Sequence, residues 1–508
     1  MTVEQSTDAS FNTPLTWESI DWPKVEQNVR RLQMRIAKAI KASKHRSVKA
    51  LQWMLTHSRS ARLLAVRRVT TNAGAKTPGI DNERWRTDKQ KLHHALNLKR
   101  HGYKALPLRR HYIPKKNGKM RPLSIPTMRD RAMQALHALA LAPIMETLGD
   151  KNSYGFREGR RCADALQQCH SLLAKGYAPA WVLEGDIKAC FDEISHNWIL
   201  QHVPMDKQIL KQWLKAGYLE KGRLFPTTAG TPQGGIVSPI LANLTLDGLE
   251  QTIKRVAKRG DKINFVRYAD DFIVTGATRE ILEQKVKPAL TDFLTPRGLR
   301  LSEQKTVITN SKEGFNFLGH TVRKFGDKLL TKPSKSNVKA LLAKVRECIK
   351  SSLAVPTEVL IRKLNPMLRG WANYYQHAAA KRTFSRVDEQ IYRALWRWTK
   401  RRHPDKSAKW RRRKYFTLTG SDGKFAVRLR PANGEDTTLK LYQTVSTRIH
   451  RYIKVRGNAN PYDPIDTEYF RKRRCFAWRI RGKARTAQTN RTILPLAGLP
   501  PDLTPEDG

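Results

Sequence analysis

The stretch INFVRYADDFIVTG at residues 263–276 constrains the fold most, because it predicts two apolar strands on either side of an acidic turn. A second apolar run, WVLEG, leads directly into Asp186. Carboxylates held at the ends of buried strands repel one another unless a cation neutralises them. Hard oxygen ligands suit Mg²⁺, and such ions can activate a hydroxyl and stabilise a leaving phosphate. The simpler alternative is that Asp270 and Asp271 only cap a hairpin turn, where Asp is common.

Around these acidic segments, short apolar strands and helices alternate without a strict strand–helix–strand period. The segment YIPKKNGKMRPLSIP predicts a hairpin that turns at its Asn-Gly pair, and a helix is expected over residues 129–149. These elements predict an α+β unit built on an antiparallel sheet. Apolar residues at helical spacing predict helices on both sides of it, over residues 22–70 and beyond residue 330. One later helix is expected to begin at Asn365, with Pro366 in its first turn.

The net charge of the chain indicates its binding partners more than it indicates its fold. Lys and Arg number 96 against 44 Asp and Glu, which gives a formal charge of +52. Such a charge repels itself unless a polyanion neutralises it, which favours nucleic acid as the partner. The alternative is a ribosome-associated protein or a merely solubilising basic surface. The densest basic run, KWRRRKYF, predicts an RNA contact, because Trp410 and Tyr415 bracket its arginines and such planes stack on unpaired bases.

The cysteines and the N-terminus bear on the compartment. The five cysteines form no C-x-x-C pair, so the sequence suggests neither a zinc site nor a disulfide framework. Unpaired thiols fit a reducing cytosol. The N-terminus lacks the apolar core of a signal peptide, and no run of about 18 apolar residues exists to span a membrane. We therefore expect a cytoplasmic protein without a membrane partner.

Six segments of the chain resemble, in family order, the sequence boxes of reverse transcriptases. They are KKNGKMRPLSIP, DIKACFD, GTPQGGIVSPILANLTLDGLE, YADD, LSEQKTVI and FNFLGH. The resemblance covers roughly residues 70–325. It implies a right-hand polymerase fold, in which fingers and an antiparallel palm sheet are followed by an all-helical thumb. It also implies RNA-directed DNA synthesis by a two-metal-ion mechanism.

The same resemblance implies roles for individual residues. The metal-binding positions would be Asp186, Asp270 and Asp271 with the main-chain carbonyl of Ile187, and they would hold two Mg²⁺ ions. Asp186 and Asp270 are the stronger candidates, while Asp271 could instead orient the primer end. The nucleotide-binding positions would be Lys115, Arg121, Phe191, Gln233 and Lys305.

Each nucleotide-binding residue has a stated task. Lys115 and Arg121 would grip the triphosphate through charge-assisted contacts, although Lys116 could replace Lys115. The ring of Phe191 would exclude a 2′-hydroxyl, and the glycines after Gln233 would allow close backbone approach. Two further residues have plainer alternatives: Lys305 could be an exposed surface lysine, and Asp192 is expected to be structural.

Beyond residue 330, the stretch LNPMLRGWANYYQH, together with KWRRRKYF, resembles the maturase (thumb) domain of proteins encoded in bacterial group II introns. TNAGAKTPGIDN near the N-terminus matches the same family. The resemblance implies a maturase that aids intron RNA splicing, and mobility by target-primed reverse transcription (retrohoming). The RNA-binding positions would be Trp410, Arg411, Arg412, Arg413 and Lys414. Two alternatives stay open: an RNA-binding maturase that does not polymerise, and a domesticated or defence-associated reverse transcriptase without an intron.

The sequence departs from the family in one respect. Many members end in a zinc-supported His-Asn-His endonuclease, but no histidine follows His450 here, and Cys475 is the only cysteine beyond it. KVRGNANPYDP, from Lys454, resembles only the start of the family's DNA-binding segment. We therefore expect the endonuclease to be lacking and the second strand of the DNA target to stay uncut by this protein.

The sequence thus predicts a division of the chain and a set of partners. The predicted regions are a helical N-terminal extension (1–70), fingers and palm (71–325), a thumb/maturase domain (330–416), a basic DNA-binding segment (417–490) and a disordered tail (491–508). The expected partners are group II intron RNA, a DNA target and primer, and deoxynucleotides, in the bacterial cytoplasm.

Overall fold

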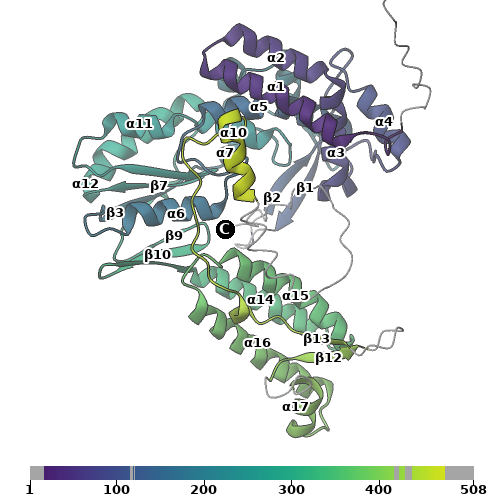
Figure 1. The fold of residues 1–508 in the computed structure, drawn as a ribbon, viewed down its shortest axis with the longest axis vertical. Helices are drawn as coiled ribbons and strands as arrows, with labels where there is room; N and C mark the ends of the chain where they lie inside the picture. The colour runs from purple at the N-terminus through teal and green to yellow at the C-terminus, as the bar shows by residue number, and fades with distance from the viewer. Residues whose placement is uncertain (1–15, 115–117, 119, 417–422, 430–436, 475–508) are drawn as a thin grey trace, which may run out of the picture.

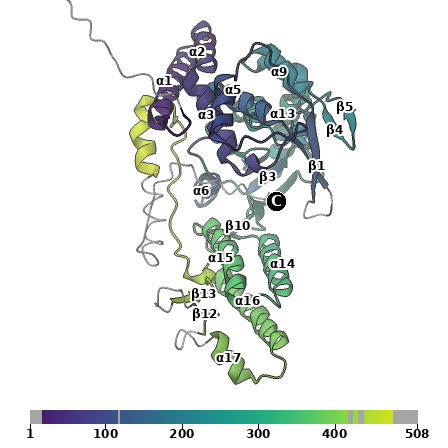
Figure 2. The same cartoon turned by 90° about the vertical axis from the view of Figure 1, so that its right-hand side faces the viewer.

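The computed structural model describes residues 16–114, 118, 120–416, 423–429 and 437–474. These residues form a broad upper lobe of helices and sheets and an elongated, mainly helical lower lobe (Figure 1). Figure 2 shows that the N-terminal helices lie on one flank of the upper lobe, and that the chain returns to them from the lower lobe. None of the helices in the described ranges is long and apolar enough to cross a membrane.

Three N-terminal helices pack against one long and mostly buried helix. They are α1 (Trp22–Lys41), α2 (His45–His57) and α3 (Arg59–Thr71), and the long helix is α5 (Met128–Leu148). Helix α1 begins where predicted, because the Asp21 side chain accepts a hydrogen bond from the Lys24 amide and Pro23 lies in the first turn. Its apolar stripe, which includes Val29 and Ile36, is buried. The predicted N-terminal helices and the predicted helix over residues 129–149 are confirmed.

A four-stranded sheet stands beside these helices in the order β2-β1-β4-β5. Its strands are β1 (Leu108–Pro114), β2 (Met120–Ile125), β4 (Tyr218–Glu220) and β5 (Arg223–Phe225). Strands β1 and β2 form the predicted hairpin, and Gly118 in its turn has a φ of 78°, a conformation that favours glycine. The turn residues 115–117 and 119 lie outside the described residues, and with them lie Lys115 and its alternative Lys116.

The second four-stranded sheet is antiparallel throughout and has the order β6-β7-β3-β8. Its strands are β3 (Trp181–Asp186), β6 (Asn264–Tyr268), β7 (Asp271–Gly276) and β8 (Val307–Asn310). Leu183 and Val274 pack into a large core on one face, whereas Val182 and Ile273 pack with α6 (Cys162–Leu173) on the other. Burial on both faces explains why these strands are so apolar, and it confirms the predicted α+β unit on an antiparallel sheet.

The remaining elements of the upper lobe lie around the two sheets. They are α4 (Asp88–Leu96), α7 (Cys190–Glu193), α8 (His196–His202), α9 (Lys207–Leu214), α10 (Ser238–Leu246), α11 (Leu249–Val256), α12 (Arg279–Ile281) and α13 (Lys287–Leu294). A small sheet then leads into the lower lobe; its strands are β9 (Phe315–Phe317), β10 (His320–Phe325) and β11 (Lys328–Pro333).

The lower lobe is a helix bundle with a hairpin beside it. Its elements are α14 (Lys335–Ser351), α15 (Thr357–Tyr374), α16 (Lys381–Arg402), α17 (Ala408–Phe416), β12 (Ala426–Leu429) and β13 (Thr437–Lys440). The prediction that a helix begins at Asn365 is wrong, because α15 begins at Thr357 and contains Pro366. Proline removes one helical hydrogen bond, but Leu364 and Leu368 on either side of it are fully buried, and this packing carries the helix through.

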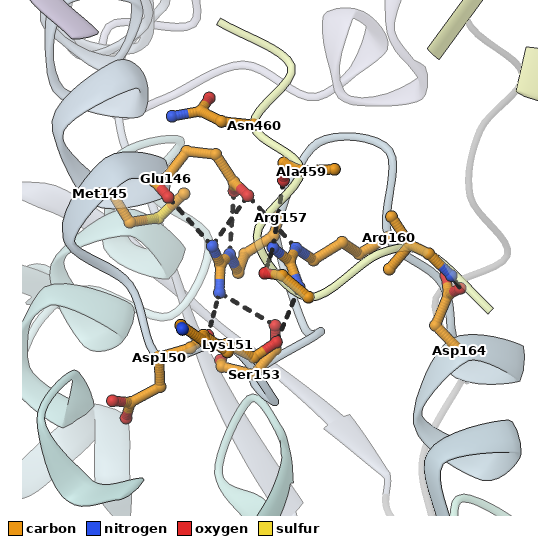
Figure 3. A network of polar contacts seen from close by, with 12 residues as sticks. Met145, Glu146, Asp150, Lys151, Ser153, Arg157, Arg160, Asp164, Ala459 and Asn460 are labelled. Atoms are coloured by element: carbon orange, nitrogen blue, oxygen red, sulfur yellow. Dashed lines mark hydrogen bonds and ion pairs between the residues drawn. The ribbon is translucent and has the colours of Figure 1, made fainter. Parts of the chain in front are cut away.

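After the β12–β13 hairpin, the chain crosses back to the upper lobe. We call residues 451–474 the returning segment (the yellow end of the chain in Figures 1 and 2). Lys41 of α1 forms an ion pair with Asp463 of this segment. Figure 3 shows a buried contact of this segment, where Arg160 lies between the Glu146 carboxylate, at 3.2 Å, and the main-chain carbonyl of Ala459, at 3.5 Å. The described part of the predicted DNA-binding region 417–490 therefore lies partly against the upper lobe.

Candidate active site

Two strands of the antiparallel sheet meet at one edge, and each carries a carboxylate there. Asp186 is the last residue of β3 and Asp271 is the first residue of β7, and the register pairs them directly. Asp270 lies in the tight turn between β6 and β7, next to Ala269. The structure therefore brings together the three aspartates that the sequence singled out.

The surroundings of Asp270 and Asp271 disfavour the charged forms of these two carboxylates. Desolvation by the surrounding protein, and then the charges of Asp270 and Asp186, raise the pKa of Asp271 to about 7. Desolvation also raises the pKa of Asp270, and the Asp186 charge adds to that rise. The Nζ atom of Lys305 lies 3.2 Å from Oδ1 of Asp186, and its charge acts in the opposite direction on both pKa values. A divalent cation would relieve the same repulsion more completely.

The donor set fits a metal ion that is shared with a substrate. Within the described ranges, no group of three or more His, Cys, Asp or Glu side chains is arranged to hold a metal ion by itself. Mg²⁺ commonly takes only one or two carboxylates and completes its shell with waters and substrate phosphates. Ile187, whose carbonyl was the fourth predicted ligand, is buried beside Asp186, and a strand bridge to Leu301 fixes its main chain. The residues present therefore fit a hard divalent cation in an open site.

Phe191 lies in the short helix α7, five positions after Asp186. Its ring is half-buried and meets the ring of Phe156 edge-on, with centroids 6.3 Å apart. Its carbonyl oxygen accepts a hydrogen bond from the Thr231 amide at 2.6 Å. Gly230 has a φ of 81°, and a Cβ there would lie 2.6 Å from that carbonyl oxygen, so this close approach requires glycine. The main chain of Phe191 is thus fixed by this hydrogen bond, and its ring packs against Phe156.

Gln233 connects the palm edge to the first sheet. Its Nε2 donates a hydrogen bond to Oδ2 of Asp192 at 3.0 Å, and its carbonyl accepts one from the Ser124 amide of β2 at 2.8 Å. Asp192 is thus in contact with a predicted nucleotide-binding residue, and its structural role stays a prediction. Arg121 belongs to the same strand, and its charge lowers the pKa of Asp270, so it lies on the side of the carboxylates. Lys115 lies outside the described residues, so its prediction stays open.

The predicted RNA-binding run forms helix α17 at the far end of the lower lobe (Figure 1). Arg412, Arg413 and Lys414 are exposed on it. Arg411, by contrast, is only 7% exposed, and its guanidinium lies 5.0 Å from the centre of the Trp396 ring. The ammonium of Lys414 lies over the ring of half-buried Trp410, at 4.7 Å. The exposed members stay RNA-binding candidates, whereas Arg411 packs against the bundle.

One set of residues near the site was not predicted. Arg267 in β6 is fully buried, and it forms an ion pair with Asp247 and a hydrogen bond to Asn243. A signal was available, because a charged residue in the middle of INFVRY requires a buried partner if the strand is central.

The fold and the site together define a class of protein. An antiparallel sheet with carboxylates at one edge, a hairpin sheet beside it and a helical lobe after it make up the right-hand polymerase architecture, and the predicted fold class is confirmed.

Comparisons with known proteins narrow this class. Three family models match successive parts of the chain: the N-terminal domain of reverse transcriptase (17–98), reverse transcriptase (RNA-dependent DNA polymerase) (113–322) and the group II intron maturase-specific domain (338–416). Protein YkfC of Escherichia coli K12 is 32% identical over 301 residues, which are 50% of this chain and 78% of that protein. The group II intron-encoded protein LtrA of Lactococcus lactis is 32% identical over 328 residues.

The chain therefore belongs to the reverse transcriptase/maturase family of group II intron-encoded proteins, as its motifs predicted. The alignment with LtrA covers 51% of this chain and 54% of LtrA, so the chain spans about half the length of that relative. The expected lack of an endonuclease stays a prediction, because residues 475–508 lie outside the described residues.

Proposed function

We propose that this chain copies RNA into DNA and helps a group II intron RNA to splice and to move. The observation that carries the proposal is the register pair of Asp186 and Asp271, with Asp270 in the adjoining turn, in a chain that also matches the intron maturase-specific domain. In this proposal residues 71–325 form the fingers and palm, residues 330–416 form the thumb, and the basic residues that follow meet DNA.

The carboxylate edge would hold two Mg²⁺ ions. Asp186, Asp270 and Asp271 would bind them together with the Ile187 carbonyl, and the raised pKa values of Asp270 and Asp271 support a cation there. When bound, such ions lower the pKa of a primer 3′-hydroxyl and stabilise the charge on leaving pyrophosphate. The chain itself contributes the placement of the metal ligands, because strands β3 and β7 hold two of the carboxylates in register. Lys305, at 3.2 Å from Asp186, would balance charge as the substrate enters.

The deoxynucleotide would lie between β2 and the palm edge. Arg121 and Lys115 would meet its triphosphate, where charge-assisted bonds are strong. Gln233, held by Asp192 at 3.0 Å, would lie along the nucleotide. The ring of Phe191, which packs edge-on against Phe156, would occupy the space that a 2′-hydroxyl needs, so deoxynucleotides would be preferred.

The intron RNA would meet the exposed face of the lower lobe. Arg412, Arg413 and Lys414 of α17 offer phosphate contacts, and Trp410 next to them offers a partly exposed ring. We place the protein in the bacterial cytoplasm, since none of the four cysteines of the described ranges is in a disulfide. A DNA target and primer complete the set of partners that target-primed reverse transcription needs.

Two assays with the purified 508-residue chain test the proposal. The first measures dTTP incorporation on poly(rA)/oligo(dT), and we expect extension with Mg²⁺ and none after chelation by EDTA. The second measures splicing of precursor RNA taken from DNA that flanks the reading frame, and we expect the protein to accelerate it. Extension without any effect on splicing would favour a domesticated or defence-associated enzyme, whereas splicing without extension would favour a maturase that does not polymerise.

A further inference from the structure

Arg267 is the largest fully buried side chain of the described residues, and it carries a charge directly beside the catalytic turn. Its Nη2 lies 2.6 Å from Oδ1 of Asp247, which ends helix α10. Its Nη1 donates to Oδ1 of Asn243, in the same helix, at 3.0 Å. A buried charge must be paired and hydrogen-bonded to persist, and α10 supplies both partners. Asp247 and Asn243 therefore hold the guanidinium of Arg267 in place.

The same guanidinium reaches forward to the turn that carries Asp270. Its Nη1 also donates to the main-chain carbonyl of Ala269 at 3.3 Å. Ala269 has a φ of 58°, in the left-handed region that a residue with a Cβ seldom adopts. Such a conformation persists only when its surroundings impose it. The hydrogen bond from Arg267 is one of the contacts that impose it.

The loop at residues 152–155 holds the turn from its other side. Gly155 approaches so closely that a Cβ there would lie 2.3 Å from the Ala269 nitrogen. The Gly155 carbonyl accepts a hydrogen bond from Nδ2 of Asn243 at 2.9 Å, so Asn243 joins Arg267 to this loop. The main chain of Arg267 is also paired with Asn152 and Tyr154. The Ala269 turn thus lies between two supports that share Asn243.

We infer that Arg267, anchored by Asp247 and Asn243, is a positioning residue that sets the place of Asp270 and Asp271 relative to Asp186. This inference rests on the proposed function, since it assigns the turn a catalytic task. Arg267 touches neither metal nor substrate and acts through the carbonyl of Ala269. The planar fork of arginine meets Asp247, Asn243 and Ala269 at once, whereas a lysine ammonium has only one nitrogen.

The test compares Arg267→Lys with a matched control, Arg160→Lys. Arg160 is also buried, with a side chain 2% exposed, and it forms an ion pair with Glu146 at 3.2 Å (Figure 3). The hydrogen bonds assigned to Arg160 reach neither the loop 152–155 nor residues 268–271. Both variants lose a buried guanidinium and should lose similar thermal stability, so only a positioning role separates them.

Five quantities are measured on wild type and both variants. They are the melting temperature, kcat and KM for dTTP across a Mg²⁺ titration, the Kd for template–primer, and Mn²⁺ affinity by electron paramagnetic resonance without substrate. For Arg267→Lys we expect kcat to fall about 100-fold, as misplacement of reacting groups by about 1 Å does. We expect KM for dTTP and template–primer Kd within about threefold of wild type, because those contacts lie elsewhere. The Mg²⁺ needed for half-maximal rate should rise, and Mn²⁺ affinity should fall. Arg160→Lys should keep the wild-type kcat per folded molecule.

The outcomes separate the inference from the proposed function. Arg267→Lys with wild-type kcat, Mg²⁺ requirement and Mn²⁺ affinity, but lower melting temperature, would overturn the inference, because Arg267 would then be core packing alone. If wild type itself extended no primer, the proposed function would fail, yet weaker Mn²⁺ binding by the variant would still support the positioning role. Should Arg267→Lys not fold, Asn243→Ala replaces it. This variant keeps the Arg267–Asp247 ion pair and should shift kcat and Mn²⁺ affinity in the same direction. Wild-type values for that variant would also overturn the inference.

Discussion

Removing Arg473 should release the returning segment from the palm. Asp164 on α6 is fully buried and accepts hydrogen bonds from Nη2 of Arg473 at 2.7 Å, from the Val455 amide at 2.6 Å and from the Arg161 amide at 2.8 Å. Arg473→Ala leaves that carboxylate without its cation, and breaking a buried pair costs about 3–5 kcal/mol. The Arg473 side chain is 17% exposed, so water would replace part of the lost contact, and we expect the lower end, about 3 kcal/mol. This corresponds to a roughly 100-fold larger population of the undocked segment.

Amide hydrogen exchange read by mass spectrometry measures this population directly. Exchange across residues 451–474 should accelerate by about two orders of magnitude in Arg473→Ala, while exchange in the β3–β7 strand pair should change little. The matched control is Lys472→Ala on the same turn, since Lys472 is 74% exposed and its nearest carboxylate oxygen, on Glu468, is 3.7 Å away. An exposed pair of this kind contributes at most about 1 kcal/mol. Equal protection of the segment in both variants and wild type would refute the reasoning.

Three further predictions concern Phe191, the RNA-binding candidates of α17 and His320 at the junction between the lobes. Phe191→Val should admit ribonucleotides, because a smaller side chain vacates the space of a 2′-hydroxyl; the ratio of rNTP to dNTP incorporation measures this, and an unchanged ratio would mean that Phe191 only packs. Replacing Arg413 and Lys414 by Ala should reduce the slope of log affinity for intron RNA against log salt by roughly two, one per lost phosphate contact. Arg411→Ala should instead lower stability, because Arg411 packs on Trp396. An unaltered slope for the first variant would mean that α17 does not bind the RNA. Burial lowers the pKa of His320, in β10 beside the thumb, to about 4, whereas an unfolded histidine titrates near 6.5. As the pH falls, the unfolded state therefore takes up this proton before the folded state does, and the free energy of unfolding should fall by about 2 kcal/mol between pH 6.5 and pH 5. Urea unfolding of His320→Gln should lack this part of the fall. An equal fall in both proteins would assign it to other groups.

The palm and its carboxylates could be predicted because their signals are local. Strands β6 and β7 are separated by two residues, so a single hairpin of apolar residues around two aspartates predicts both the sheet and the site. The fingers hairpin and the α1 helix are equally local, and both were predicted. The thumb was predicted as helical, but the start of α15 was not, because the burial of Leu364 and Leu368 overrides the usual preference of proline for a first turn.

What could not be predicted depends on contacts between distant positions. Lys41 and Asp463 form an ion pair although they lie 422 positions apart in the sequence, and no periodicity in either segment predicts that pairing. Consecutive residues of a helix point about 100° apart, so four basic residues in a row cannot share one face, yet the sequence does not say which one turns inward. It is Arg411, because Trp396 lies on that side. The partner of Arg267 lies 20 positions earlier, and only the fold shows that it is Asp247.

The central claim is that Asp186, Asp270 and Asp271 form the catalytic centre of a reverse transcriptase. The most direct measurement is the single-turnover rate of dTTP addition to oligo(dT) on poly(rA), with saturating Mg²⁺, for wild type and for Asp270→Asn combined with Asp271→Asn. The account predicts that the double variant binds template–primer as wild type does but extends it at least about 1000-fold more slowly, because the metal-binding charge is gone. Extension by the double variant near the wild-type rate would contradict the account and would place the catalytic centre elsewhere in the chain.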